Sequence, residues 1–210
     1  MEEIKILYKD EDVVVCIKPV GLSSESTDNK DGLCDLLALQ LGKKEVYTLH
    51  RLDVGVGGLM AYALNKKSAA ILSKDIAEGD FHKYYTADVY GCPQENEGVF
   101  EDLLFKDSKK NKSFVVNKER KGVKKAKLAY KVIESRKDGD KQITTVEVYL
   151  YTGRSHQIRV QFSHRGMPLL GDGKYGAKDN QKQISLCCTR LVFNRPSDNE
   201  RLTFEIPYGI

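Results

Sequence analysis

Residues 50–63, HRLDVGVGGLMAYA, set a charged trio directly before three glycines and an apolar run. Asp53 carries the most useful chemistry in this stretch. A carboxylate is ionised at neutral pH without a partner base, so it can act as a nucleophile or as a base. An aspartate before glycines also commonly caps a turn. From this stretch alone, the catalytic and the structural interpretations of Asp53 both stay open.

The glycines after Asp53 do not form a phosphate-binding loop. Such loops space their glycines as GxGxxG or GxxxxGK(S/T) and lead into the N-terminus of a helix. Gly55, Gly57 and Gly58 fit neither spacing, and they lead into LMAYA, which is compatible with a β-strand. We expect instead that these glycines permit a tight bend and the close approach of another chain segment.

The composition limits the class of protein. The 210 residues are 40% hydrophobic and 30% charged, which is typical of a soluble globular protein with one large domain or two small subdomains. No apolar run is long enough to span a bilayer, and the charged N-terminus lacks the apolar region of a signal peptide. The five cysteines form no CxxC pair, which favours reduced thiols over a disulfide framework or a zinc ribbon. We therefore expect a cytoplasmic protein.

One segment is strongly basic although the net charge of the chain is only +4. Residues 106–127 contain ten lysines or arginines and two acidic residues. A stripe of this kind can neutralise the phosphates of a nucleic acid. A solvated loop and hairpin would explain the same composition equally well.

The pattern of apolar residues predicts the elements that must position these side chains. Helical spacing and helix signals occur at 33–41, near 66–78 and within 152–168. Strand-like alternation and turn signals predict strands at 4–8, 12–18, 82–91, 127–136, 141–151, 184–193 and 201–206. Hairpins mixed with dispersed helices favour an α+β fold, with a mixed, mostly antiparallel central sheet flanked by helices and loops.

Four separated stretches, in this order, resemble the RluA-type pseudouridine synthase family. They contain an ILYKDEDVVVCIKPVGLSSE opening, the HRLD motif, a K-x-Y-x-A-x-V-x-G pattern, and a GRSHQIRVQF segment followed by GDGKYG; they are residues 6–25, 50–63, 83–91 and 152–176. The resemblance implies the pseudouridine synthase catalytic fold with a central cleft. It also implies one catalytic domain over residues 1–210, or two subdomains that share one sheet, without the N-terminal S4 RNA-binding domain of many members.

The sequence departs from the family pattern at two places. Gly55-Val56-Gly57-Gly58 stand where the family usually has an acidic residue followed by Thr-Ser-Gly, and Ser155 stands in place of a threonine. The resemblance leaves the chemical residues intact, so the altered loop beside Asp53 bears on substrate choice.

The resemblance also assigns roles that suit the chemistry of pseudouridine formation. The reaction breaks the glycosidic C–N bond of uridine and joins the sugar to C5 of the same base, with no redox change. Asp53 matches the catalytic aspartate. Burial would raise its pKa, and the guanidinium of Arg159, its implied partner, would oppose that shift. Tyr85 matches a tyrosine that stacks on the uracil, an interaction worth about 1–3 kcal/mol.

Four further residues are predicted to bind the substrate: Arg51, Lys83, Lys124 and Lys125. Arg51 matches a family arginine that fills the space left by the flipped nucleotide, and a surface salt bridge is the alternative for it. His50, His156 and His164 do not complete a metal-ligand set, so we expect them to hold loops by hydrogen bonds. Asp172 and Tyr175 are expected to be turn and packing residues.

The sequence therefore predicts an RNA pseudouridine synthase that isomerises specific uridines in a structured stem-loop of ribosomal or transfer RNA. We expect it to act as a cytoplasmic monomer, with no cofactor, no metal and no membrane. Two alternatives remain open at this point, a non-catalytic RNA-binding protein on the same fold and a metal-dependent hydrolase that uses the histidines. Asp53, Tyr85 and Arg159 occur together, which a pure binding protein would not need.

Overall fold

The computed structural model describes residues 3–27 and 30–209 and has the expected α+β class. The chain divides into two compact units, of which unit 1 is Met1–Lys83 with Cys187–Ile210 and unit 2 is Tyr84–Leu186. Among the strand pairs with a described register, only β4 with β10 is parallel and the others are antiparallel. The prediction of a mostly antiparallel, mixed arrangement is therefore confirmed. The prediction of a single domain stays a prediction.

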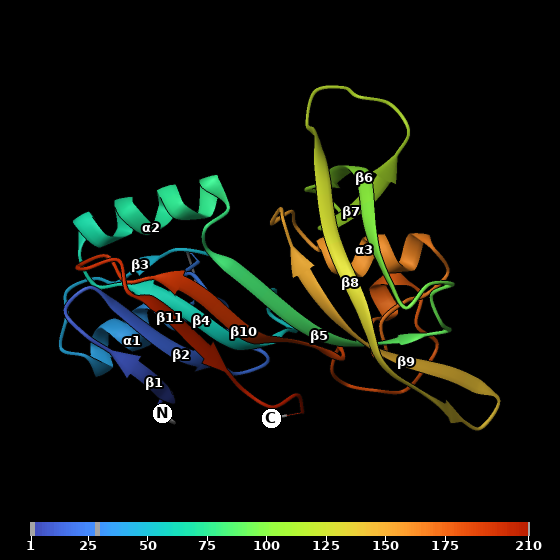
Figure 1. Cartoon of the computed structure of the whole chain (residues 1–210), viewed down its shortest axis with the longest axis horizontal. Helices are drawn as coiled ribbons and strands as arrows, with labels where there is room; N and C mark the ends of the chain where they lie inside the picture. The colour runs from blue at the N-terminus through green and yellow to red at the C-terminus, as the bar shows by residue number, and fades with distance from the viewer. Residues whose placement is uncertain (1–2, 28–29, 210) are drawn as a thin grey trace. The chain divides into compact units, whose positions relative to one another are not determined.

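Unit 1 contains a sheet in the order β1-β2-β4-β10, in which β11 pairs with β10 and β3 with β4. Its elements are β1 (Ile6–Lys9), β2 (Val13–Lys18), α1 (Leu33–Gln40), β3 (Tyr47–Thr48), β4 (Gly57–Ala63), α2 (Lys66–Glu78), β10 (Leu186–Asn194) and β11 (Arg201–Glu205). Every residue of β4 is buried, as expected for a strand with neighbours on both edges. The α2 helix runs along β3 and β4 (Figure 1), begins with the Asn65 side chain accepting from the Ser68 N–H, and ends at Gly79 in the left-handed region.

Gly58 confirms that the glycines of HRLDVGVGG allow another chain segment to approach. Its φ is +115°, and a Cβ at this position would lie 2.4 Å from the carbonyl oxygen of Cys188 on β10. Gly58 and Cys188 are also partners in the parallel pairing of β4 with β10. A side chain here would therefore separate two strands of the unit 1 core.

Unit 2 contains a sheet in the order β5-β9-β8-β6-β7. Its elements are β5 (His82–Tyr90), which begins in unit 1, β6 (Glu97–Asp107), β7 (Lys112–Val116), β8 (Val123–Asp138), β9 (Lys141–Leu150), α3 (Gln157–His164) and the short 3₁₀ helix η1 (Gly173–Tyr175). Phe162 of α3 packs edge-on against Phe100 and Tyr130, with ring centroids 5.1 Å and 5.9 Å apart. These contacts hold α3 against β6 and β8 (Figure 1).

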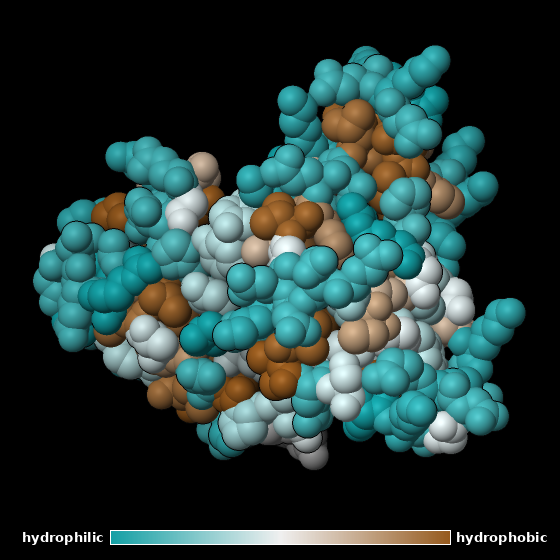
Figure 2. Space-filling model, turned by 45° about the vertical axis from the view of Figure 1, so that its right-hand side comes forward, coloured by the Kyte–Doolittle hydropathy of each residue, from teal (hydrophilic) through white to brown (hydrophobic). Residues whose placement is uncertain are grey.

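The basic segment 106–127 is part of this sheet. It forms the end of β6, all of β7 and the start of β8, joined by tight connections. Residues 117–122 are exposed at the β7–β8 turn, and Figure 2 shows mainly hydrophilic residues at this tip. The sequence predicted neither β6 nor β7, and the helix signals of 152–168 produce only the shorter α3. No helix in the described part of the chain is long and apolar enough to cross a membrane.

Candidate functional site

Asp53 lies on the loop that leads into β4, where the main chain on both sides of it is fixed. The Val56 N–H donates to the Asp53 carbonyl at 2.9 Å, which closes the turn after it. Before it, the buried Ser24 hydroxyl donates to the Leu52 carbonyl and accepts from the Leu52 N–H, both at 3.0 Å. The Gly21 N–H donates to the Val54 carbonyl at 2.7 Å. The carboxylate is therefore presented from a backbone with little freedom.

Lys18 is a cation beside Asp53 that sequence reasoning missed. It ends β2, is 1% exposed, and donates from Nζ to the carbonyls of Pro19 and Leu22 at 3.0 Å and 2.7 Å. Burial lowers the pKa of its ammonium to about 8, and the negative charge of Asp53 opposes that shift. The signal in the sequence was a lysine placed within the strand-to-turn sequence IKPVG.

His50 and Lys83 are both buried in unit 1. The His50 Nε2 accepts from the Ala61 N–H at 3.3 Å, and burial lowers its pKa to about 3, so the ring is neutral and has a structural role. The Lys83 Nζ donates to the Phe81 carbonyl at 3.5 Å and lies 5.3 Å from the centroid of the Phe81 ring. Burial lowers the pKa of Lys83 as well.

Arg51 lies on the surface of unit 1. Its Nη1 is 3.1 Å from Glu25 Oε2, and the two side chains are 67% and 44% exposed. An ion pair that is this exposed contributes at most about 1 kcal/mol, because water and salt screen it. Arg51 can therefore exchange Glu25 for another anion at little cost.

Tyr85 points away from Tyr84 on β5, as strand alternation predicts. Tyr85 is 5% exposed and pairs in register with Val148 of β9. The Tyr84 ring packs instead against Tyr149, with ring centroids 5.1 Å apart. The two tyrosine side chains therefore lie on opposite faces of the unit 2 sheet.

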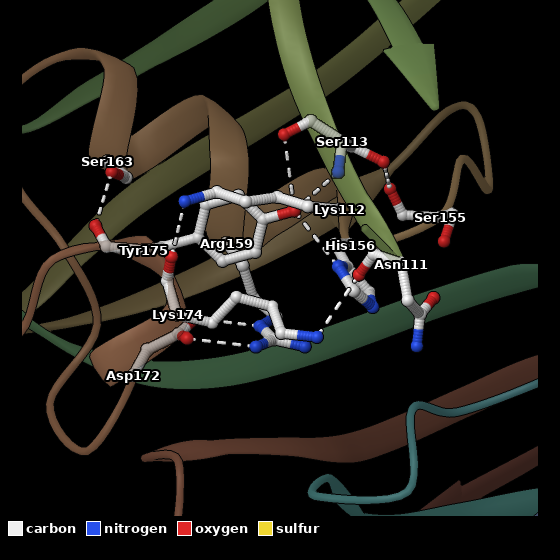
Figure 3. A network of polar contacts seen from close by, with 10 residues as sticks. All are labelled: Asn111, Lys112, Ser113, Ser155, His156, Arg159, Ser163, Asp172, Lys174 and Tyr175. Atoms are coloured by element: carbon white, nitrogen blue, oxygen red, sulfur yellow. Dashed lines mark hydrogen bonds and ion pairs between the residues drawn. The ribbon is translucent and has the colours of Figure 1, made fainter. Parts of the chain in front are cut away.

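Arg159 is held by a carboxylate that the sequence suggested was only a turn residue. Its Nε donates to Asp172 Oδ2 at 2.7 Å and its Nη2 donates to Asp172 Oδ1 at 2.8 Å (Figure 3). The two side chains are 7% and 1% exposed. A bidentate pair of this kind fixes the plane of the guanidinium as well as its position, and it uses the Nε–Nη2 edge.

Tyr175 holds the same arginine from the side. Its ring centroid lies 5.1 Å from the Arg159 guanidinium carbon. Its hydroxyl accepts from the Ser113 N–H of β7 at 2.8 Å and lies 2.9 Å from His156 Nδ1 (Figure 3). His156 precedes α3 with φ +54°, in the left-handed region. These contacts tie η1, β7 and the start of α3 together around Arg159.

Lys124 and Lys125 are exposed at the start of β8. The Lys125 Nζ lies 3.7 Å from Glu119 Oε1, and both side chains are largely exposed. The Lys125 carbonyl accepts from Arg154 Nε at 2.9 Å, which links this part of β8 to the segment before α3.

The sequence-predicted site residues thus fall into two groups. Unit 1 carries Asp53, Arg51 and Lys83, and unit 2 carries Tyr85, Arg159, Lys124 and Lys125. Sequence reasoning missed Lys18, the pairing of Asp172 with Arg159, and the contacts of Tyr175. In the described part of the chain, no group of histidine, cysteine, aspartate and glutamate side chains has an arrangement that could hold a metal ion.

Residues 12–164 match the family model described as RNA pseudouridylate synthase. An uncharacterized RNA pseudouridine synthase of Haemophilus influenzae is 32% identical over 206 residues, which cover 91% of this chain and 83% of that protein. The dual-specificity RNA pseudouridine synthase RluA of Yersinia pestis is 32% identical over 202 residues, 91% of this chain and 95% of that protein. Human RNA Pseudouridylate Synthase Domain Containing 1 has the same fold, with a TM-score of 0.81 over 97% of this chain and 83% of that chain at 24% identity.

Proposed function

Because the chain belongs to the RNA pseudouridylate synthase family and is an RNA pseudouridine synthase, we propose that it isomerises specific uridines of ribosomal or transfer RNA with Asp53 as catalytic aspartate. The observation that carries the proposal is the position of Asp53. It lies in the HRLD motif, inside the segment that matches the family model, on a loop whose main chain is fixed on both sides.

The surroundings of Asp53 support a reactive carboxylate. A catalytic carboxylate must stay ionised while the uridine ring excludes water from it. The buried ammonium of Lys18 supplies a positive charge that attracts Asp53 within unit 1. Either attack on the sugar or removal of a proton from it requires this ionised form.

Arg159 and Tyr85 are proposed to complete the chemistry. Arg159 keeps its positive charge at every relevant pH, and its pair with Asp172 holds the guanidinium in one plane. Such a cation stabilises negative charge that develops on the uracil or on the aspartate. Tyr85 supplies a ring on which the detached uracil stacks and can turn before it rejoins the sugar through C5.

The RNA is proposed to be a structured stem-loop. Its target uridine must leave the stack, which costs a few kcal/mol. Arg51 can replace Glu25 with a phosphate and occupy the gap, while Lys83 contributes charge from inside unit 1. Lys124 and Lys125 supply exposed positive charge on β8. We expect the enzyme to act as a monomer in the cytoplasm.

Tritium release from RNA labelled at uracil C5 tests this function. Wild-type protein is compared with Asp53→Asn, which keeps the side-chain shape but removes the charge, and with Asp31→Asn as a surface control. Release should fall to background in Asp53→Asn and stay near wild type in the control. If wild-type protein released no tritium from ribosomal or transfer RNA, or if Asp53→Asn stayed active, the proposal would be refuted.

A further inference from the structure

Two lysines from distant parts of unit 2 each donate to a backbone carbonyl in the other's segment. Lys112 is the first residue of β7 and Lys174 is the middle residue of η1. The Lys112 Nζ donates to the Lys174 carbonyl at 2.5 Å, and the Lys174 Nζ donates to the Asn111 carbonyl at 3.1 Å. Figure 3 shows the two side chains running in opposite directions, so their ammonium groups lie at opposite ends of the pair.

Further contacts order the Lys112 ammonium group. The Lys112 Nζ lies 4.9 Å from the centroid of the buried Tyr175 ring, and the next residue, Ser113, donates its N–H to the Tyr175 hydroxyl. A lysine side chain normally loses up to about 2 kcal/mol of conformational freedom when it is ordered. Much of this loss has already occurred here, so an anion that binds to these lysines gains correspondingly in affinity.

The charges of these two lysines are not neutralised by acidic partners. Both known bonds go to neutral backbone carbonyls, and neither lysine forms an ion pair with a carboxylate within the residues that the structure describes. The nearby Asp172 is bonded to Arg159.

Two other lysines of the basic segment differ in this respect. Lys125 lies 3.7 Å from Glu119, and Lys127 lies 2.7 Å from Glu101. These carboxylates compete with phosphate for the two lysines. Lys112 and Lys174 differ from Lys125 and Lys127, because backbone carbonyls hold their ammonium groups and, within the described residues, a phosphate has no carboxylate to displace there.

We propose that Lys112 and Lys174 form a binding site for the phosphates of the RNA backbone, with one phosphate at each ammonium group. A lysine ammonium binds phosphate as a compact point charge. The Tyr175 ring contacts both Lys112 and Arg159, at 4.9 Å and 5.1 Å. The phosphates bound here therefore belong to nucleotides close to the target uridine on which Arg159 is proposed to act. This inference rests on the proposed RNA substrate, but not on Asp53 as the catalyst.

The test is the salt dependence of RNA binding by the full chain. Lys112→Gln, Lys174→Gln and the double variant are titrated with unfractionated transfer RNA and with fragmented ribosomal RNA between 50 and 200 mM KCl. The logarithm of the RNA association constant falls linearly with the logarithm of the salt concentration. Each lost phosphate contact makes this slope shallower by about 0.7–0.9, and the double variant should make it shallower by about twice that. Lys137→Gln, an exposed lysine at the far end of β8, is the control and should keep the wild-type slope.

Charge-preserving variants separate a phosphate contact from a structural role. Lys112→Arg and Lys174→Arg should retain the slope, and melting temperatures show whether each glutamine variant is folded. An unchanged slope in the double variant, a loss of equal size in Lys137→Gln, or no RNA binding by wild-type protein overturns the inference. Competition by polyglutamate as strong as that by RNA also overturns it. If the slopes change as expected but wild-type protein releases no tritium, the result counts against the proposed function and not against this phosphate site.

Discussion

Removing the charge of Asp172 tests whether its carboxylate holds Arg159 in place. Asp172→Asn keeps the shape of the side chain but replaces one acceptor oxygen with an amide that only donates. The two contacts are Nε to Oδ2 at 2.7 Å and Nη2 to Oδ1 at 2.8 Å. One of these hydrogen bonds must be lost, and a donor then faces a donor. The guanidinium stays charged, since arginine does not deprotonate in proteins.

The expected loss of stability is large because water cannot compensate. The Arg159 and Asp172 side chains are 7% and 1% exposed. Breaking a buried pair by removing one partner costs about 3–5 kcal/mol, which lowers the melting temperature of a chain of this size by about 6–20 °C. Urea and thermal unfolding measure this loss directly. At saturating RNA, tritium release should fall by about 100-fold, the effect of displacing a catalytic group by about 1 Å.

Asp102→Asn is the matched control, because it removes a second arginine–aspartate pair next to α3. Arg165 Nη1 lies 2.8 Å from Asp102 Oδ2, but this pair is more exposed, with side chains 28% and 10% accessible. The loss of stability should be smaller and tritium release should stay near wild type. Equal losses in the two variants, or a loss below about 1 kcal/mol in Asp172→Asn, would refute the reasoning.

A double variant separates the effect on the free energy of unfolding from the effect on the reaction. Arg159→Met/Asp172→Leu replaces the buried pair with apolar side chains, and such replacements are often neutral or stabilising. Its free energy of unfolding should recover to within about 1 kcal/mol of wild type, while tritium release stays lost. An active double variant would show that the reaction does not need the cation.

Two further predictions concern unit 1. Gly58→Ala should lower the melting temperature strongly or prevent folding, since its Cβ would lie 2.4 Å from the Cys188 oxygen at a φ of +115°. Gly153→Ala, which meets open space, should have little effect, and similar melting temperatures for the two would contradict this. Lys18 has a pKa of about 8 against an ordinary 10.5, so the unfolded chain binds more protons between these values. The free energy of unfolding should therefore rise with pH across that window, by on the order of 3 kcal/mol in wild type and not in Lys18→Met. Parallel pH profiles in urea unfolding would contradict the Lys18 prediction.

Local signals predicted most elements well. The α2 helix spans 66–78 as expected, because Asn65 caps it and Gly79 ends it in the left-handed region. The β6 strand was missed for a local reason as well. Its fully buried residues, Phe100 and Leu104, are four positions apart, and the residues between them are at least partly exposed. A spacing of four fits one face of a helix as well as one face of a strand, so it does not identify a strand.

The pairing of Asp172 with Arg159 could not be predicted from local sequence. GDGK is typical of a turn, and the partner lies 13 positions away on α3. The structure shows why Arg159 needs a partner, since all six residues Gln157–Phe162 of this short helix are buried, including Arg159. A buried arginine requires an acidic or hydrogen-bonding partner. The family resemblance implies that Arg159 is the partner of Asp53, which stays a prediction, and it gives no indication of Asp172.

The turn Asp172–Tyr175 contacts both the proposed catalytic arginine and the proposed phosphate-binding lysines, which lie in separate segments of the sequence. Asp172 orients the guanidinium of Arg159, Lys174 points its ammonium toward β7, and Tyr175 packs against both Arg159 and Lys112. Lys112 and Arg159 thus contact the same buried ring. We therefore expect RNA backbone binding and the orientation of the proposed catalytic arginine to be coupled. Tyr175→Phe keeps the ring but removes the hydroxyl contacts with Ser113 and His156 that hold it in place, so Lys112→Gln should change tritium release less in Tyr175→Phe than in wild type.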